Sequence, residues 1–167
     1  MFKTIKDFEE AWKRESTNTQ KMMDALTDQS LAQPVADDHR TLGRVAWHIL
    51  TTYPEMTNQI GVNIQSVKQD APVPTSAEEI KKTYKSVAGE LLDIVKENWT
   101  DETLWVEDEM YGEKWARGVT LEILIRHEIH HRGQMTVLMR QAGLKVPGIY
   151  GPALEEWGSY GMQAPSI

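Results

Sequence analysis

Four stretches of the sequence repeat apolar residues every three or four positions, which is the spacing of one face of an α-helix. These stretches lie at about residues 5–26, 41–60, 76–98 and 120–142. Residues typical of helix ends mark the boundaries: Thr41, Ser76 and Thr120 suit N-caps, Thr4 with Asp7 resembles a capping pair, and Gly143 suits a stop. Four helices of this length predict an all-α protein with a four-helix bundle.

The segments between the expected helices include long connections, so the order of the helices in the bundle stays open. Residues 101–118 lack a helical period, and apolar residues flank Tyr111-Gly112-Glu113, which predicts a short hairpin or ordered loop before the last helix. The tail, residues 147–167, is rich in Gly and Pro and is expected to be irregular, with one helical turn near 153–157. We expect residues 1–167 to form a single domain.

Charge and composition exclude several classes of function. The formal net charge is −7 and no basic block stands out, which argues against binding to nucleic acid or to an anionic membrane. There is no cysteine, so a metal site must use His, Asp or Glu. Residues 1–15 are charged, and no segment approaches the roughly 20 apolar residues of a membrane span. We therefore expect a cytoplasmic protein.

Three of the five histidines lie in the run His127-Glu128-Ile129-His130-His131. His127 and His131 are four residues apart, so they share one face of a helix. Leu124, Met135 and Leu138 continue the same face, which should point into the bundle. Buried imidazoles need polar partners. A shared metal ion would satisfy both, whereas the alternative is that each histidine forms hydrogen bonds with its neighbours.

His48 is the best candidate for a third ligand, because it is the one other histidine inside an expected helix. His39 lies in a loop and His130 points about 100° away from His131, so both are expected to be solvated. Such a site with open positions suits Zn²⁺, while Ni²⁺, Fe²⁺ and Mn²⁺ remain alternatives. Three side chains are candidates for orienting ligands or moving protons: Glu55, Glu128 and Gln134.

One interpretation of the cluster is the H-E-x-x-H signature of zinc metallopeptidases, formed by His127, Glu128 and His131. Glu128 would then be the general base, and Glu155 or Glu156 could supply a further ligand. No convincing substrate-binding sheet precedes this helix to form the wall of a peptide cleft, and a small bundle offers little room for an extended peptide, which weakens that interpretation.

A wider set of residues resembles the DinB-like family. The upstream run Val45-Ala46-Trp47-His48-Ile49 and the later run from Arg126 to Met135, with its His-x-x-x-His-Arg-Gly-Gln pattern, carry the resemblance. The tail from Pro147 to Pro152 is also similar to that of some members. The resemblance implies a bundle in which His48, His127 and His131 bind zinc or nickel. It also implies that some relatives are dimers and that a few are transferases or isomerases dependent on bacillithiol, mycothiol or glutathione.

We therefore expect a metal-dependent enzyme that acts on small molecules, with thiol S-transfer as the most specific reaction class, and a homodimer. The alternatives are a metal-dependent hydrolase and a non-catalytic, metal-stabilised stress-response module. Two neighbours of the cluster carry further expectations. Glycine within a helix costs about 1 kcal/mol relative to alanine, so Gly133 is expected to meet a closely packed segment, with mere tolerance of the glycine as the alternative. Arg132 is expected to hold a carboxylate, within the fold or across a dimer.

Overall fold

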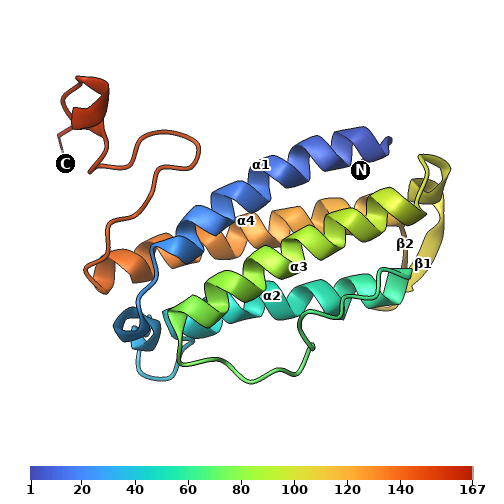
Figure 1. Cartoon of the computed structure of the whole chain (residues 1–167), viewed down its shortest axis with the longest axis horizontal. Helices are drawn as coiled ribbons and strands as arrows, with labels where there is room; N and C mark the ends of the chain where they lie inside the picture. Colours follow the sequence, from blue (N-terminus) through green and yellow to red (C-terminus); the bar gives the residue numbers. More distant parts are fainter. Residues whose placement is uncertain (167) are drawn as a thin grey trace.

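The computed structural model describes residues 1–166 and shows an elongated bundle of α-helices (Figure 1). Within those residues the four α-helices are α1 (Ile5–Asp24), α2 (Leu42–Thr57), α3 (Ala77–Asn98) and α4 (Arg117–Gln141). Short 3-10 helices lie in the connections and the tail: η1 (Asp28–Ala32), η2 (Asn58–Ile60), η3 (Glu102–Trp105) and η4 (Trp157–Tyr160). The prediction of an all-α four-helix bundle is confirmed.

The first three α-helices begin where the sequence predicts, at residues whose side chains cap the exposed backbone amides. Thr4 accepts a hydrogen bond from the amide of Asp7 at 3.0 Å. Thr41 accepts one from the amide of Arg44 at 3.2 Å. Ser76 accepts one from the amide of Glu79 at the start of α3. Each cap satisfies a donor that has no partner within its helix, which fixes the start of the helix.

Helix α4 begins at Arg117, three residues before the expected cap, Thr120. Thr120 is instead fully buried inside the helix. The reason is the preceding hairpin of β1 (Glu107–Met110) and β2 (Glu113–Ala116), which leads directly into α4. The amide of Arg117 donates to the carbonyl of Val106 at 2.9 Å, so contacts with the hairpin replace a side-chain cap.

The hairpin itself was expected, and its turn consists of Tyr111 and Gly112. Both have positive φ, 54° and 83°, as a two-residue hairpin turn of the favoured twist requires. The register pairs Glu107 with Ala116 and Met110 with Glu113. Met110 is fully buried, so the hairpin closes one end of the bundle core.

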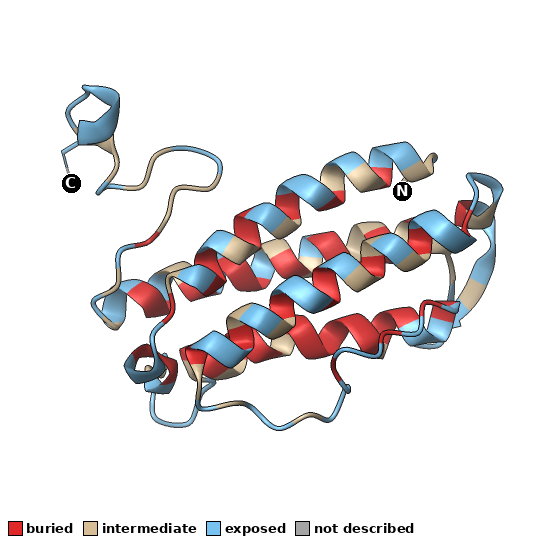
Figure 2. Ribbon diagram, in the orientation of Figure 1, coloured by how far each residue is buried: buried red, intermediate tan, exposed pale blue. Residues whose placement is uncertain are grey.

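The apolar faces of the helices meet in one core, with α2 packed mainly against α4 and α1 against α3 (Figure 2). Trp12 on α1 is 1 % exposed, and its indole N–H donates to the carbonyl of Ala88 on α3 at 2.9 Å. Helix α2 continues through Pro54 to Thr57. Burial of α2 on most sides makes it a rigid base for any side chain that it presents.

The tail leaves the end of α4 and extends beyond the bundle (Figure 1). Gly143 ends the helix with a φ of 75°, as expected. The helical turn in the tail is η4 at Trp157–Tyr160, a few residues later than the expected 153–157. Among residues 1–166, no helix combines the length and the apolar character needed to cross a bilayer.

Candidate metal centre

Two helices bring three histidines together near the middle of the bundle. His48 comes from α2, and His127 and His131 come from successive turns of α4. A ring nitrogen from each lies within 4.8 Å of the others. The Nε2 atoms of His127 and His131 are 3.0 Å apart. The structure thus brings together the three residues that the sequence nominated as ligands.

This spacing fits a shared divalent cation. Zinc–imidazole bonds are about 2.0–2.1 Å long, so nitrogens 3.0 Å apart on one ion would subtend an angle of roughly 91–97°. His131 is 7 % exposed, while His48 and His127 are half-buried. The site is therefore enclosed on the side of the core and open on the other, which is compatible with three protein ligands and free positions.

Burial keeps the imidazoles in the form that binds metals. It lowers the pKa of His48 to about 4, and the positive charges of Arg40 and Arg44 act in the same direction. Burial likewise lowers the pKa of His127 to about 4, with the neighbouring histidines adding to the effect. The pKa of His131 is also lowered by burial. At neutral pH these rings are uncharged and carry a free lone pair.

Gln134 orients one of the rings. Its Oε1 atom lies 2.7 Å from Nδ1 of His131, and its Nε2 atom lies 3.0 Å from Nε2 of His130. An amide oxygen only accepts hydrogen bonds, so the Nδ1 of His131 carries the proton and its Nε2 is left to face the cluster. His130 is exposed and stays outside the group of three. Of the three candidate orienting side chains, Gln134 is the one that contacts the cluster.

Glu128 does not lie beside the three histidines. It is fully buried and accepts hydrogen bonds from the hydroxyls of Tyr53 and Tyr84, the latter at 2.8 Å. Burial raises the pKa of Glu128, although the hydroxyl contacts oppose the rise. One step along a helix rotates a side chain by about 100°, which turns Glu128 from the histidine face toward α2 and α3. This placement does not suit a general base beside the histidines.

The other acidic candidates are also engaged away from the cluster. Glu55 accepts a hydrogen bond from the hydroxyl of Tyr111 at 2.6 Å. Glu155 pairs with Arg140 at 2.7 Å. Glu156 accepts the backbone amides of Gly148 and Ala153 at 2.9 and 3.0 Å. None of them belongs to the group of potential ligands found among residues 1–166.

Arg132 contacts a carboxylate within the fold. This is one of the two expected alternatives, the other being a carboxylate across a dimer. Its guanidinium lies 2.7 Å from Glu15 on α1, and both side chains are 3 % exposed. The same guanidinium donates to Thr19 at 3.0 Å and contacts the hydroxyl of Tyr150 in the tail. Sequence reasoning missed Glu15. The available signal was a run of polar residues on an otherwise apolar face of the first helix, since Asn18 and Thr19 are buried beside it.

The expectation for Gly133 is wrong. A Cβ atom at this position would meet no heavy atom within 4 Å, so no segment packs closely there. The close approach occurs at Gly118 instead, where a Cβ would lie 2.4 Å from the carbonyl oxygen of Phe2. The glycine at the start of α4 thus makes room for the N-terminal segment.

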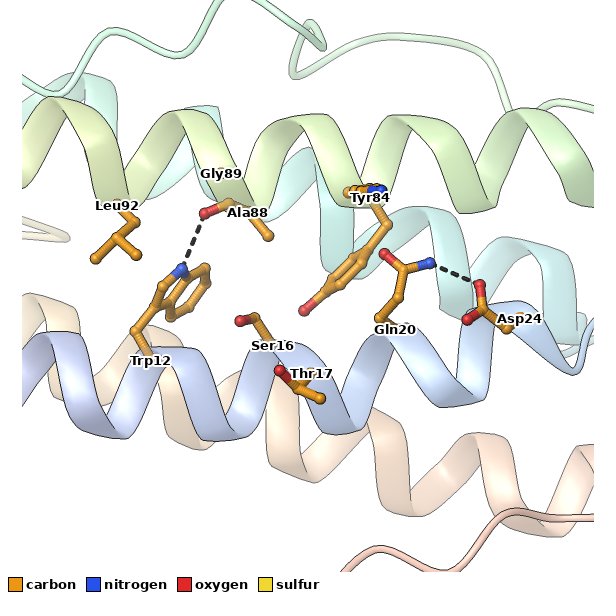
Figure 3. A pocket seen from close by; sticks show the side chains of 10 residues that line it. Trp12, Ser16, Thr17, Gln20, Asp24, Tyr84, Ala88, Gly89 and Leu92 are labelled. Carbon is orange, nitrogen blue, oxygen red and sulfur yellow. Dashed lines mark hydrogen bonds between the residues drawn. The ribbon is translucent and has the colours of Figure 1, made fainter.

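Among the hollows found in residues 1–166, two flank the bundle core. One, of about 510 Å³, adjoins His131 and is lined by Val35, His39, Arg40, Val45, His131, Gln134, Val137 and Leu138. The other, of about 460 Å³, lies between α1 and α3, with Trp12 and Tyr84 in its wall (Figure 3). The first hollow adjoins the cluster at His131, and His39 also lies in its wall.

Comparison with known proteins identifies the family and supports the fold. Residues 1–163 match the model of the DinB family. YrdA of Bacillus subtilis (strain 168), described as uncharacterized, is 44% identical over 167 residues, covering 100% of both chains. The crystal structure of a DinB-like protein from Bacillus cereus ATCC 10987 aligns with a TM-score of 0.87 and 46% identity, covering 90% of this chain and 100% of that one. The DinB-like protein YjoA of B. subtilis shares the fold, with a TM-score of 0.68 at 19% identity, over 88% of this chain and 99% of that one. The chain belongs to the DinB family.

Proposed function

We propose that His48, His127 and His131 bind one divalent metal ion and that the protein is a metal-dependent enzyme for small molecules. The observation that carries this proposal is the meeting of three imidazole nitrogens within 4.8 Å beside an open hollow. An all-nitrogen donor set with neutral ligands favours Zn²⁺ or Ni²⁺, with Fe²⁺ and Mn²⁺ as alternatives.

Thiol S-transfer is the reaction that we propose, and the substrate is a low-molecular-weight thiol. In this reaction the sulfur forms a bond to an electrophilic carbon, the leaving group departs with its bonding electrons, and the thiol proton passes to water. The metal, when bound, would favour the thiolate form of the sulfur. Gln134 would keep Nε2 of His131 directed at the cluster, and Val45 and Leu138 would exclude water from the floor of the hollow.

Peptide hydrolysis with Glu128 as base is less well supported, because this carboxyl group is sealed between Tyr53 and Tyr84. Thiol chemistry also suits the cytoplasm, where thiols stay reduced, and we place the protein there. The resemblance to dimeric relatives supports a homodimer, which light scattering on the purified protein would test.

Metal analysis tests the site. The purified protein should hold about one ion per chain, and His48→Ala should lose it. His130→Ala is the control, because His130 lies on α4 next to His131 but outside the group of three, and this variant should keep the ion. Full retention of metal in His48→Ala would reject the site.

The reaction is tested separately with a model electrophile and a panel of thiols, including bacillithiol, mycothiol and glutathione. Metal-dependent conjugate formation with one of them is the expected result. If no thiol reacts and chelation only lowers the melting temperature, the metal stabilises the fold and the protein is a non-catalytic module.

A further inference from the structure

The hollow beside His131 has an apolar surface that nothing in the fold covers. Val45 and Leu138 at its base are 3 % and 0 % exposed, and they belong to the core. Val35 and Val137 in its walls are 55 % and 56 % exposed. A concave surface of exposed valines above buried core residues is suited to the hydrocarbon part of a small ligand.

The same hollow has a cation without a partner. Several arginines each contact a carboxylate, namely Arg14, Arg117, Arg126, Arg132 and Arg140. Over residues 1–166, Arg40 and Arg44 form no ion pair. Arg40 lines the hollow, and Arg44 lies one turn further along.

These two cations stand out because the chain as a whole has a net charge of −7. Arg40 and His131 line the same hollow, so the charge of Arg40 lies beside the histidine cluster. Asp37 and Asp38 lie in the same loop but do not line the hollow. The mouth of the site is thus locally positive, and a divalent ion on the histidines would add to this.

We propose that the hollow binds a small organic acid, whose carboxylate pairs with Arg40 and whose hydrocarbon part lies on Val35, Val45 and Val137. This inference rests on the proposed function, because it names the substrate class of the same site. A thiol substrate would carry a carboxylate at the end opposite its sulfur. Guanidinium groups suit this role because they form paired, charge-assisted hydrogen bonds with carboxylates.

The hollow of Figure 3 lacks this combination. Its wall includes Lys85 and Asp24, so both signs of charge are present, and Asp24 accepts a hydrogen bond from Gln20 at 2.8 Å. The structure therefore favours an acid at the histidine side of the bundle rather than between α1 and α3.

Two thiols of equal length test the proposal on the cobalt-substituted protein. They are 6-mercaptohexanoate and 6-mercaptohexanol, and the sulfur–cobalt absorption band reports their binding. The carboxylate should bind at least about tenfold tighter, which is the lower end of the gain from a hydrogen bond to a charged group. Arg40→Gln should bring the ratio close to one. Arg126→Gln, a change at an exposed arginine outside the hollow, should leave the ratio unchanged. Equal affinity of the native protein for both thiols would overturn the inference.

A second measurement keeps this inference separate from the metal. Octanoate and octanol are titrated into the metal-free, ¹⁵N-labelled protein, and the amide signals of Val35 and Val137 are followed. Octanoate should shift them at lower concentration than octanol, and Arg40→Gln should abolish the difference. If the protein fails to bind cobalt but the metal-free protein still prefers octanoate, the metal site alone is rejected. If the metal-free protein shows no preference for octanoate, the acid-binding site is overturned.

Discussion

The side-chain oxygen of Gln134 lies 2.7 Å from Nδ1 of His131, one turn away on the same helix. This contact fixes the tautomer and the ring orientation of a proposed ligand. Partners of metal-bound histidines typically contribute about 10–100-fold to metal affinity. Gln134→Leu should therefore weaken metal binding by about that factor in a competition assay with a chromophoric chelator. Gln141→Leu, at the exposed end of α4, should not change it, and an unchanged affinity in Gln134→Leu would contradict the role of Gln134.

Glu128 should act on stability rather than on chemistry. In Glu128→Leu the buried hydroxyls of Tyr53 and Tyr84 lose their acceptor, which should cost about 1–3 kcal/mol for each group. Urea unfolding measures this loss, and metal content should persist wherever the variant is folded. In Glu128→Gln most of the stability should return. A Glu128→Gln variant that is stable and metal-loaded but has lost a hydrolytic activity would instead identify Glu128 as a base.

Removing Arg132 should be among the most damaging single changes. Arg132→Met removes the buried cation beside the carboxylate of Glu15 and leaves it only the exposed Arg14 at 3.0 Å, and breaking a buried pair typically costs about 3–5 kcal/mol. The double variant Glu15→Leu/Arg132→Met should recover much of this loss, because no buried charge is left unpaired. Denaturant unfolding of the two variants makes the comparison. Additive losses in the double variant would show that the two side chains do not depend on each other.

The same pair predicts how stability depends on pH. Burial disfavours the charged form of Glu15, but hydrogen bonds from Tyr150 and Arg132 outweigh it and lower the pKa of this carboxyl. A lowered pKa in the folded state means that the unfolded chain takes up the proton first. The pair should thus stabilise the fold fully above the pKa of an unfolded glutamate, about 4.3. This contribution should disappear as the pH falls through the lower, folded value. The urea midpoint of Glu15→Leu/Arg132→Met should fall less steeply below pH 5 than that of the native protein.

Two glycines of α4 should respond in opposite ways to alanine. Gly133→Ala places a methyl group where nothing lies within 4 Å, so it should stabilise the helix by up to about 1 kcal/mol. Gly118→Ala drives its Cβ into the carbonyl of Phe2 and should destabilise the protein. Thermal unfolding of the two glycine variants tests this prediction. A loss of stability in Gly133→Ala would mean that another chain packs on this face in solution.

Local patterns explain how much the sequence could predict. The caps at Thr41 and Ser76 and the stop at Gly143 act within one helical turn, so the boundaries that they set could be found from neighbouring residues. The spacing of His127 and His131 likewise placed them on one face, and His48 was nominated because it is the one other histidine inside an expected helix. By contrast, the start of α4 depends on the hairpin that precedes it, which is why Thr120 was taken for a cap.

The remaining differences come from contacts between residues that are distant in the chain. No residue near Glu128 in the sequence indicates that Tyr53 and Tyr84 enclose it. The H-E-x-x-H match therefore suggested a general base where the fold has a buried, hydrogen-bonded carboxyl group. Glu15 and Arg132 are also paired only by the packing of α1 on α4. Gly133 shows that a costly residue need not have a packing reason within its own chain.

The proposed ligands come from opposite halves of the chain, so only the folded protein can bring His48 to His127 and His131. A ligand that binds the folded state alone stabilises it by about 2.7 kcal/mol when its free concentration is 100 times the dissociation constant. Under the proposed function, metal supply would therefore raise the stability of a chain that also folds without the ion. In cells short of the ion the protein would be more exposed to degradation, so its abundance would fall with metal availability.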